Sequence, residues 1–189
     1  DVIEYPIDDL IDINGWDLQK ALRLLYKSNP TVFEWCSSPI VYMESDLLLK
    51  FKSLMPNFFS CKSSLFHYLN MAESNYRSYL KTPNVRIKKY FYVLRPLLAA
   101  QWIVNKKSQP PMLFKELVDS ELDVSIKPVV EKLLQLKIEQ SEIGITTKFQ
   151  ALNDYIEEKL KYLKNVATNL VEDKTYSWDI LNKFFLEAI

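Results

Sequence analysis

Glycine is nearly absent from this chain, with only Gly15 and Gly144 among 189 residues. Tight hairpins and phosphate-wrapping loops need backbone conformations that glycine adopts most easily. Two glycines exclude a Gly-x-Gly-x-x-Gly dinucleotide motif, and they argue against a P-loop or an all-β fold. The composition therefore favours a mainly α-helical fold.

Charge of one sign, metal-binding residues and long apolar runs are also lacking. The 24 basic residues balance 24 acidic ones, so any nucleic-acid contact must come from a local patch. Cys36, Cys61 and the single His67 lack metal-ligand spacing, which excludes a zinc site and predicts free, partly buried thiols in a cytoplasmic protein. Because no apolar run has the length of a membrane-spanning helix, we expect no membrane contact.

The first fourteen residues combine β-branched and acidic side chains, which predicts one or two strands. Pro6 places one of these strands at an edge, because proline cannot donate a ladder hydrogen bond. Gly15 is expected to end this region before the first helix. An exposed strand edge also predicts a homo-oligomer that pairs through it.

Hydrophobic residues make up 48% of the chain, enough for a real core, and most recur at helical spacing. The first helix is expected to begin after Asp17 as its cap and to stop at Asn29, with Thr31 capping the next. Pro96 should kink its helix or remove one backbone bond. We expect the first helix between Asp17 and Asn29, and the third to open at Ser45-Asp46 and run to Leu54. The other helices are expected over residues 32–36, 60–81, 85–106, 112–119, 126–140, 147–168 and 176–188.

Three stretches carry a resemblance to a known family. The first runs Asp12-Ile13-Asn14-Gly15-Trp16-Asp17-Leu18-Gln19-Lys20-Ala21-Leu22-Arg23-Leu24-Leu25 and continues into Asn29-Pro30-Thr31-Val32-Phe33-Glu34. The second is His67-Tyr68-Leu69-x-Met71-Ala72 with Asn75-Tyr76. The third and most specific is Arg86-Ile87-Lys88-Lys89-Tyr90-Phe91-Tyr92-Val93-Leu94-Arg95-Pro96-Leu97-Leu98.

Together these stretches resemble predicted nucleotidyltransferases of the DNA polymerase β superfamily, in the branch associated with RNA repair. The resemblance covers roughly residues 1 to 120. It implies a helical carboxy-terminal body with one or two strands left from a split α/β nucleotidyltransferase sheet. The implied domains are a remnant of the α/β domain over residues 1–43 and a helical domain over residues 44–189.

The resemblance also implies a chemistry, the Mg²⁺-dependent transfer of a nucleotidyl group from a nucleoside triphosphate to a hydroxyl, on an RNA end. In such enzymes two divalent cations bridge the attacking and leaving oxygens. The family carries Gly-Ser and Asp-x-Asp motifs in its first strand-loop unit, and neither occurs here. The chain opens without methionine, so we expect both motifs upstream of Asp1 and no catalysis by this chain alone.

The family's third carboxylate is assigned to Asp12, as a catalytic and metal-binding residue, because it stands on the strand before the lysine-bearing helix. Strand alternation places Asp12 on one face with Leu10 and Asn14. Glu4 and Asp8 are the competing assignments. The alternative interpretation is an acidic edge strand that deters aggregation.

A basic helical face is assigned to the nucleotide. Lys88, Tyr92 and Arg95 lie at i, i+4 and i+7, so they share one side of the helix and could hold triphosphate oxygens. Arg86 flanks this face, and Lys20 would approach from the opposite side. The alternative interpretation is a solvated basic face over an aromatic core.

A second function class remains open, a non-catalytic helical protein-interaction module. The neutral net charge, the amphipathic helices and the missing metal motif favour it.

Overall fold

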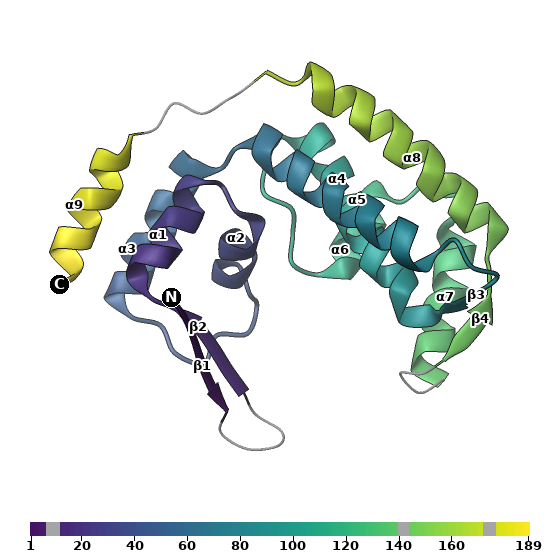
Figure 1. Ribbon diagram of the computed structural model, residues 1–189, viewed down its shortest axis with the longest axis horizontal. Helices are drawn as coiled ribbons and strands as arrows, with labels where there is room; N and C mark the ends of the chain where they lie inside the picture. The colour runs from purple at the N-terminus through teal and green to yellow at the C-terminus, as the bar shows by residue number, and fades with distance from the viewer. Residues whose placement is uncertain (7–11, 140–143, 172–176) are drawn as a thin grey trace. The chain divides into compact units, whose positions relative to one another are not determined.

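The computed structural model describes residues 1–6, 12–139, 144–171 and 177–189 (Figure 1). These residues form nine α-helices, one short 3₁₀ helix and two small two-stranded antiparallel sheets, which confirms the mainly α fold class. None of the helices within these ranges is both long enough and apolar enough to cross a membrane. The predicted strands at the start are β1 (Val2–Pro6) and β2 (Asp12–Trp16), which pair with each other.

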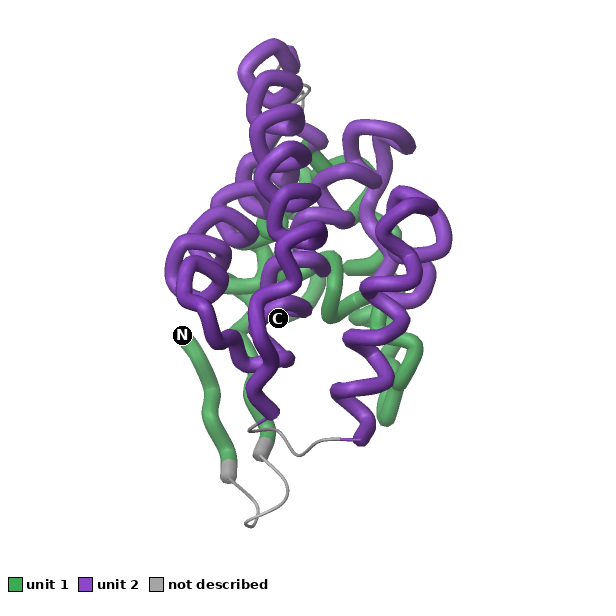
Figure 2. Tube along the Cα trace, turned by 90° about the vertical axis from the view of Figure 1, so that its right-hand side faces the viewer, with its two compact units in different colours: residues 1–60, 173–189 green, residues 61–172 purple. Residues whose placement is uncertain are grey.

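The chain forms two compact units, which Figure 2 colours separately. The first unit comprises residues 1–60 and 173–189, and the second comprises residues 61–172. The boundary predicted after residue 43 lies inside the first unit, ahead of α3 (Asp46–Leu54).

The first unit packs α1 (Leu18–Tyr26), α2 (Pro30–Cys36), α3, the 3₁₀ helix η1 (Met55–Phe58) and α9 (Trp178–Ala188) around one apolar core. Aliphatic and aromatic side chains share this core, and Phe51 and Phe184 lie edge to face at 6.0 Å between ring centroids. The core residues that are buried are Leu22, Leu25, Val32, Phe33, Phe51, Met55, Phe58, Leu181 and Phe184.

Side-chain caps explain where the helices of this unit begin. The carboxylate of Asp17 accepts a hydrogen bond from the Lys20 amide at 2.7 Å, so the predicted cap of α1 is confirmed. The predicted cap of α2 was wrong, since Asn29 rather than Thr31 supplies the oxygen, at 3.0 Å from the Thr31 amide. Pro30 then takes the first helical position, where a missing N–H costs nothing.

Gly15 does not interrupt the chain as predicted. It lies inside β2, opposite Ile3, and its backbone has no positive φ. A Cβ at this position would lie 3.9 Å from the Cβ of Ile3, an ordinary contact. The left-handed conformations among the described non-glycine residues belong to Ser28, after α1, and Lys107, after α5 (Ile87–Lys106).

The second unit is built on α4 (Cys61–Tyr79) and α5, which pack along one another, with α6 (Phe114–Glu121), α7 (Lys127–Glu139) and α8 (Gln150–Asn169) around them. A small sheet in this unit was not predicted from the sequence. β3 (Asn84–Arg86) pairs antiparallel with β4 (Ile145–Thr147). For that reason α5 begins at residue 87 rather than 85, and α8 begins at 150 rather than 147.

A buried polar network ties three elements of the second unit together. The hydroxyl of Tyr90 on α5 donates to Asn153 Oδ1 on α8 at 3.0 Å and accepts from the Phe149 amide at 2.9 Å. The Asn153 amide donates in turn to the Leu80 carbonyl, just past α4, at 3.0 Å. Tyr90 and Asn153 are fully buried, so each bond satisfies a group that water cannot reach.

Pro96 removes one backbone bond from α5, as predicted, and α4 supplies the replacement. A proline has no N–H, so the carbonyl four residues earlier, that of Tyr92, loses its helical donor. The Asn75 side-chain amide on α4 donates to this carbonyl at 3.2 Å and to the Met71 carbonyl at 3.0 Å. Asn75 and Pro96 belong to the second and third stretches quoted above, and together they join the two central helices.

Candidate nucleotide-binding site

The acidic strand lies in the first unit. Asp12 opens β2, with its backbone opposite Pro6; its side chain is outside the described part of the structure. Glu4 on β1 is exposed and lies opposite Asn14, and Asp8 falls outside the described residues. In the described ranges no group of three His, Cys, Asp or Glu side chains could hold a metal ion. The assignment of Asp12 to a metal stays a prediction.

Lys20 lies in the first turn of α1, and its side chain is half-buried. Its backbone amide is already bonded to the Asp17 carboxylate. The amino-terminal end of α1 is therefore occupied by a carboxylate. A phosphate near Lys20 would therefore contact its ammonium group and not this backbone amide.

The basic face lies in the second unit, on α5. Lys88, Tyr92 and Arg95 fall within this one 20-residue helix, so their spacing places them on one side of it. The Tyr92 side chain is 46% exposed, whereas Lys88 and Arg95 are half-buried. Arg86 is exposed at the N-cap position, and its side chain makes no capping bond.

Positive charge is concentrated at the amino-terminal end of α5, where the helix dipole makes it unfavourable. Arg86, Lys88 and Lys89 occupy the cap and first turn, which contains no acidic residue. The amino-terminal end of a helix already carries a partial positive charge, so cations there repel it and a bound anion would relieve the repulsion. One backbone amide is already used, because Ile87 N donates to the Gly144 carbonyl at 2.9 Å.

Two of these residues also have structural contacts. Arg95 Nη2 donates to the Met112 carbonyl at 3.3 Å, which ties α5 to the segment before α6. The Lys89 ammonium lies 3.7 Å from the ring centre of Tyr79 and 4.5 Å from that of Tyr92. A base that stacked on Tyr92 would compete with Lys89 for that ring. Arg95 therefore has at least one contact that the alternative, structural interpretation requires.

The neutral net charge conceals a strong separation between the two units. Residues 61–172 contain 17 lysines and arginines against 12 aspartates and glutamates, a formal charge of +5. Residues 1–60 and 173–189 contain 7 against 12, a formal charge of −5. A polyanion would thus be attracted to the second unit.

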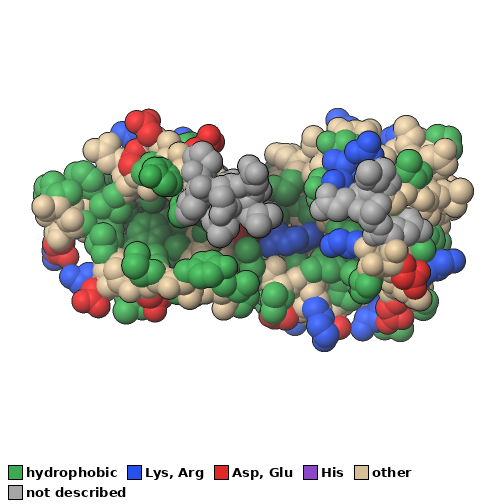
Figure 3. Space-filling view, turned by 90° about the horizontal axis from the view of Figure 1, so that it is seen from below, with side chains coloured by type: hydrophobic (Ala, Val, Ile, Leu, Met, Phe, Trp, Pro, Cys, Tyr) green, Lys and Arg blue, Asp and Glu red, His purple; other side chains and the backbone are tan. Residues whose placement is uncertain are grey.

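A hollow in the first unit was not predicted from the sequence. It has a volume of about 410 Å³ and is walled by β2, α1, α2, α3 and α9; Figure 3 shows its hydrophobic lining on the left of that view. Trp16 and Trp35 stack beside it, with ring centres 4.0 Å apart. Burial raises the pKa of the Cys36 thiol in its wall more than the charge of Lys52 lowers it, so the thiol stays protonated.

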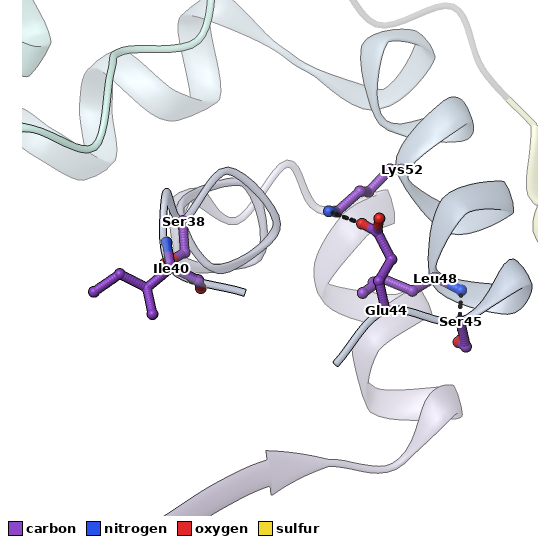
Figure 4. A network of polar contacts seen from close by, with 6 residues as sticks. All are labelled: Ser38, Ile40, Glu44, Ser45, Leu48 and Lys52. Atoms are coloured by element: carbon purple, nitrogen blue, oxygen red, sulfur yellow. Dashed lines mark hydrogen bonds and ion pairs between the residues drawn. The ribbon is translucent and has the colours of Figure 1, made fainter. Parts of the chain in front are cut away.

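The segment at the rim of this hollow is held by short-range polar contacts (Figure 4). Ser45 Oγ caps α3 by accepting from the Leu48 amide at 3.2 Å, and Lys52 pairs with Glu44 at 2.6 Å. Ser38 exchanges hydrogen bonds with the backbone of Ile40. No lysine or arginine lines the hollow among the described residues, so its walls suit an apolar group and not a phosphate.

Comparison with known proteins assigns the class. The chain belongs to the RNA repair pathway DNA polymerase beta family, whose model matches residues 1–187. This confirms the family resemblance and extends it beyond the first 120 residues. The chain is 39% identical over 191 residues to the Bacillus subtilis (strain 168) protein YcgL, described as uncharacterized, and covers 100% of itself and 74% of that relative. No solved structure matches.

Proposed function

We propose that this chain is part of a Mg²⁺-dependent nucleotidyltransferase, which transfers a nucleotidyl group from a nucleoside triphosphate to a hydroxyl on an RNA end. The observation that carries the proposal is the family match over residues 1–187. The basic start of α5 supports it, because three cations at the positive end of a helix suit a polyphosphate.

The residues have separate proposed roles. Lys88 and Arg86 would neutralise the phosphates, Tyr92 would contact the base or donate its hydroxyl, and Arg95 would hold an outer phosphate while it anchors α5. Lys20 on α1 stays a predicted triphosphate contact.

Asp12 would bind Mg²⁺, which when bound would stabilise the charge that develops on the transferred phosphate. Mg²⁺ typically takes one or two carboxylates and fills its other positions with phosphates and water. One strand carboxylate fits part of such a site.

The decisive test is an incorporation assay. The complete gene product is incubated with radiolabelled triphosphates, Mg²⁺ and single-stranded RNA that ends in a free hydroxyl. We expect label on the RNA, and a loss of at least about a hundredfold for Asp12→Asn, which keeps the shape but removes the charge. Absence of label on RNA, protein and small-molecule acceptors alike would refute the proposal.

Triphosphate binding tests the α5 face separately. Lys88→Ala should weaken ATP binding by roughly tenfold, the usual worth of one hydrogen bond to a charged group. Lys132 on α7 provides the control, because it is exposed and has no ion pair with a described residue. If Lys132→Ala weakens binding as much as Lys88→Ala, the effect is one of net charge and the assigned face is wrong.

The interaction-module alternative has one observation in its favour. Four large apolar side chains of the β1–β2 sheet are about half exposed or more: Val2, Ile3, Tyr5 and Ile13. Pairing of this sheet with a second copy would cover them. Sedimentation velocity that finds only monomer at high concentration would remove both the homo-oligomer and this support for the alternative.

A further inference from the structure

A second cationic site lies in the second unit, between α4 and α8 and away from the start of α5. It is a hollow of about 410 Å³. Four cations and two carboxylates line it, together with Tyr76 and Leu160; the charged residues are Glu73, Arg77, Lys81, Glu157, Lys161 and Lys164. The lining therefore has two more positive than negative charges. These charges are part of the formal charge of +5 on the second unit.

Two carboxylates organise these cations. Glu73 Oε1 accepts from Lys164 on α8 at 2.6 Å and from Arg77 on its own helix. Glu157 Oε1 accepts from Lys81 at 2.8 Å and from the Tyr76 hydroxyl. Both acids stay ionised, because the hydrogen bond from Lys164 holds the pKa of Glu73 low and the one from Lys81 does the same for Glu157.

These pairs leave most of the donor capacity unused. A guanidinium carries five N–H donors and an ammonium three, and each of these cations makes one hydrogen bond to its carboxylate. Arg77, Lys81 and Lys164 also keep 71%, 54% and 46% of their side-chain surface exposed. Their charges remain accessible to an anion from solvent.

Lys161 has no such partner among the described residues. It is exposed on α8, one turn before Lys164, and lines the hollow without an ion pair or hydrogen bond to any described residue. A purely structural role, in which ion pairs hold this region together, accounts for Arg77, Lys81 and Lys164. It does not account for Lys161. Within the described residues, the ion pairs therefore leave one cation of the lining unexplained.

We propose that the α4–α8 hollow binds backbone phosphates of a single-stranded polynucleotide, with Lys161 and Lys164 as its principal contacts. The volume exceeds what one inorganic ion needs and is in the range of sites that hold a molecule of nucleotide size. This site could not be predicted from the sequence, because its basic residues come from two segments that are about 80 positions apart. The inference rests on the proposed function only for the choice of RNA as the polynucleotide.

The test measures binding of the 189-residue chain to a fluorescent oligouridine of about twelve nucleotides, a length within the range of single-strand sites. Fluorescence anisotropy is recorded over a series of salt concentrations for the wild type, Lys161→Ala, Lys164→Ala and the control Lys132→Ala. Each single-strand phosphate contact contributes about 0.7 to the slope of log K against log salt. Loss of one contact should therefore weaken binding about fivefold at 0.1 M salt and reduce the slope by about 0.7.

The three variants distinguish a specific phosphate site from an effect of net charge. Weaker binding and a smaller slope for both pocket variants, with Lys132→Ala unchanged, support the site. Equal losses for all three variants mean that only net charge matters, and they overturn it. Because Lys161 has no ion pair with a described residue, its variant should melt at the wild-type temperature. Lys161→Glu should bind more weakly still, and it guards against a small effect being missed.

The source of the phosphate is tested by competition. ATP and inorganic phosphate, each at concentrations that match the oligouridine in phosphate, should displace it weakly. If Lys161→Ala weakens ATP binding as much as oligouridine binding, the hollow is a free-nucleotide site and the assignment to a polynucleotide is wrong. Transfer activity is independent of this result: an active enzyme with unchanged oligouridine binding in the variants refutes the hollow alone, and an inactive one with weakened binding refutes the proposed function alone.

Discussion

The two units of this chain differ in the sign of their charge and in what fills their cores. The first unit carries −5, has a core of aliphatic and aromatic side chains, and contains two buried polar residues, Ser28 and Ser60, in its described part. The second carries +5 and buries an amide and a tyrosine hydroxyl in one connected network. Apolar packing tolerates exchange of similar residues, whereas a buried polar network depends on each member.

The contrast suggests a division of labour. The basic unit has the charge to hold a polyanion and the directional bonds that fix helices carrying that charge. The acidic unit contains the strand with the predicted metal ligand and an apolar hollow. If the proposed RNA substrate is correct, electrostatic attraction should bring it to the second unit before the first.

The largest expected effect comes from the Tyr90 hydroxyl. Tyr90→Phe leaves the Phe149 amide and Asn153 Oδ1 without their partner, and should lower the free energy of unfolding of the second unit by about 2 kcal/mol. Hydrogen-exchange mass spectrometry should show faster exchange in α4, α5 and α8, and unchanged exchange in α1 to α3. Tyr92→Phe is the control, because that ring is exposed and the change should stay within about 0.5 kcal/mol.

If exchange accelerated equally in both units, the two cores would not be independent, and the comparison above would fail. A result in which Tyr90→Phe and Tyr92→Phe behave alike would mean that the buried network contributes nothing beyond packing.

Local signals made much of this fold predictable. The carboxylate of Asp17 and the hydroxyl of Ser45 each bond an amide three residues ahead, so the cap and the helix start are visible in a short stretch of sequence. Pro96 likewise predicted the loss of one backbone hydrogen bond in its helix. The sequence showed the missing donor but not its replacement, because Asn75 lies on another helix.

Other features depend on contacts that no short pattern contains. Strands β3 and β4 have three residues each and pair across about sixty positions, too short and too distant for an alternating pattern to reveal. The separation of charge was hidden because the whole-chain sum is zero. The family was recognised from three stretches, but the structural contacts of Arg95 and Asn75 show that part of those stretches maintains the helix pair. The roles of Asp12 and Lys20 stay predictions.

The buried polar contact of the first unit offers a smaller test. Ser28 Oγ accepts from the Ser60 amide at 2.7 Å, and the backbone of Ser28 is left-handed, with φ of 53°. Ser28→Ala should cost about 1–2 kcal/mol, since a buried amide loses its acceptor. Ser28→Gly should cost about 1 kcal/mol less than alanine, because glycine adopts this conformation without strain. Urea denaturation of the two variants measures the difference; equal costs would show that the backbone is not strained there.

The bond between Asn75 and the Tyr92 carbonyl should be worth still less, because Asn75 is half-buried. Asn75→Ala should cost about 0.5–1 kcal/mol in the wild type and close to nothing in Pro96→Ala, where an alanine N–H serves the same carbonyl. A double-mutant cycle measured by thermal unfolding gives this coupling directly. Additive effects of the two changes would contradict the explanation of why α4 carries an asparagine there.

The smallest expected effect is the pH dependence of the ion pairs in the α4–α8 hollow. It distinguishes ion pairs that only hold two helices together from a site that binds phosphate. The folded-state pKa of Glu157 is held below its ordinary value of 4.5, chiefly by the hydrogen bond from Lys81. Its contribution to stability is therefore fully present above that ordinary value and is lost as pH falls through the depressed folded-state pKa. The loss should be small, as for other exposed pairs, and Glu157→Gln should remove it from urea midpoints measured between pH 6 and pH 3.

Protonation of Glu157 and Glu73 also frees Lys81, Arg77 and Lys164 from their carboxylates. If the ion pairs of the hollow only hold two helices together, oligouridine affinity should be insensitive to protonation of the two acids or should fall with stability. If it binds phosphate, affinity should rise as the acids lose their charge, so affinity and stability should change in opposite directions over the same pH range. Uracil takes up no proton in this range and backbone phosphates stay ionised, so a parallel fall of both quantities would count against the phosphate site even if both Lys161 and Lys164 mattered.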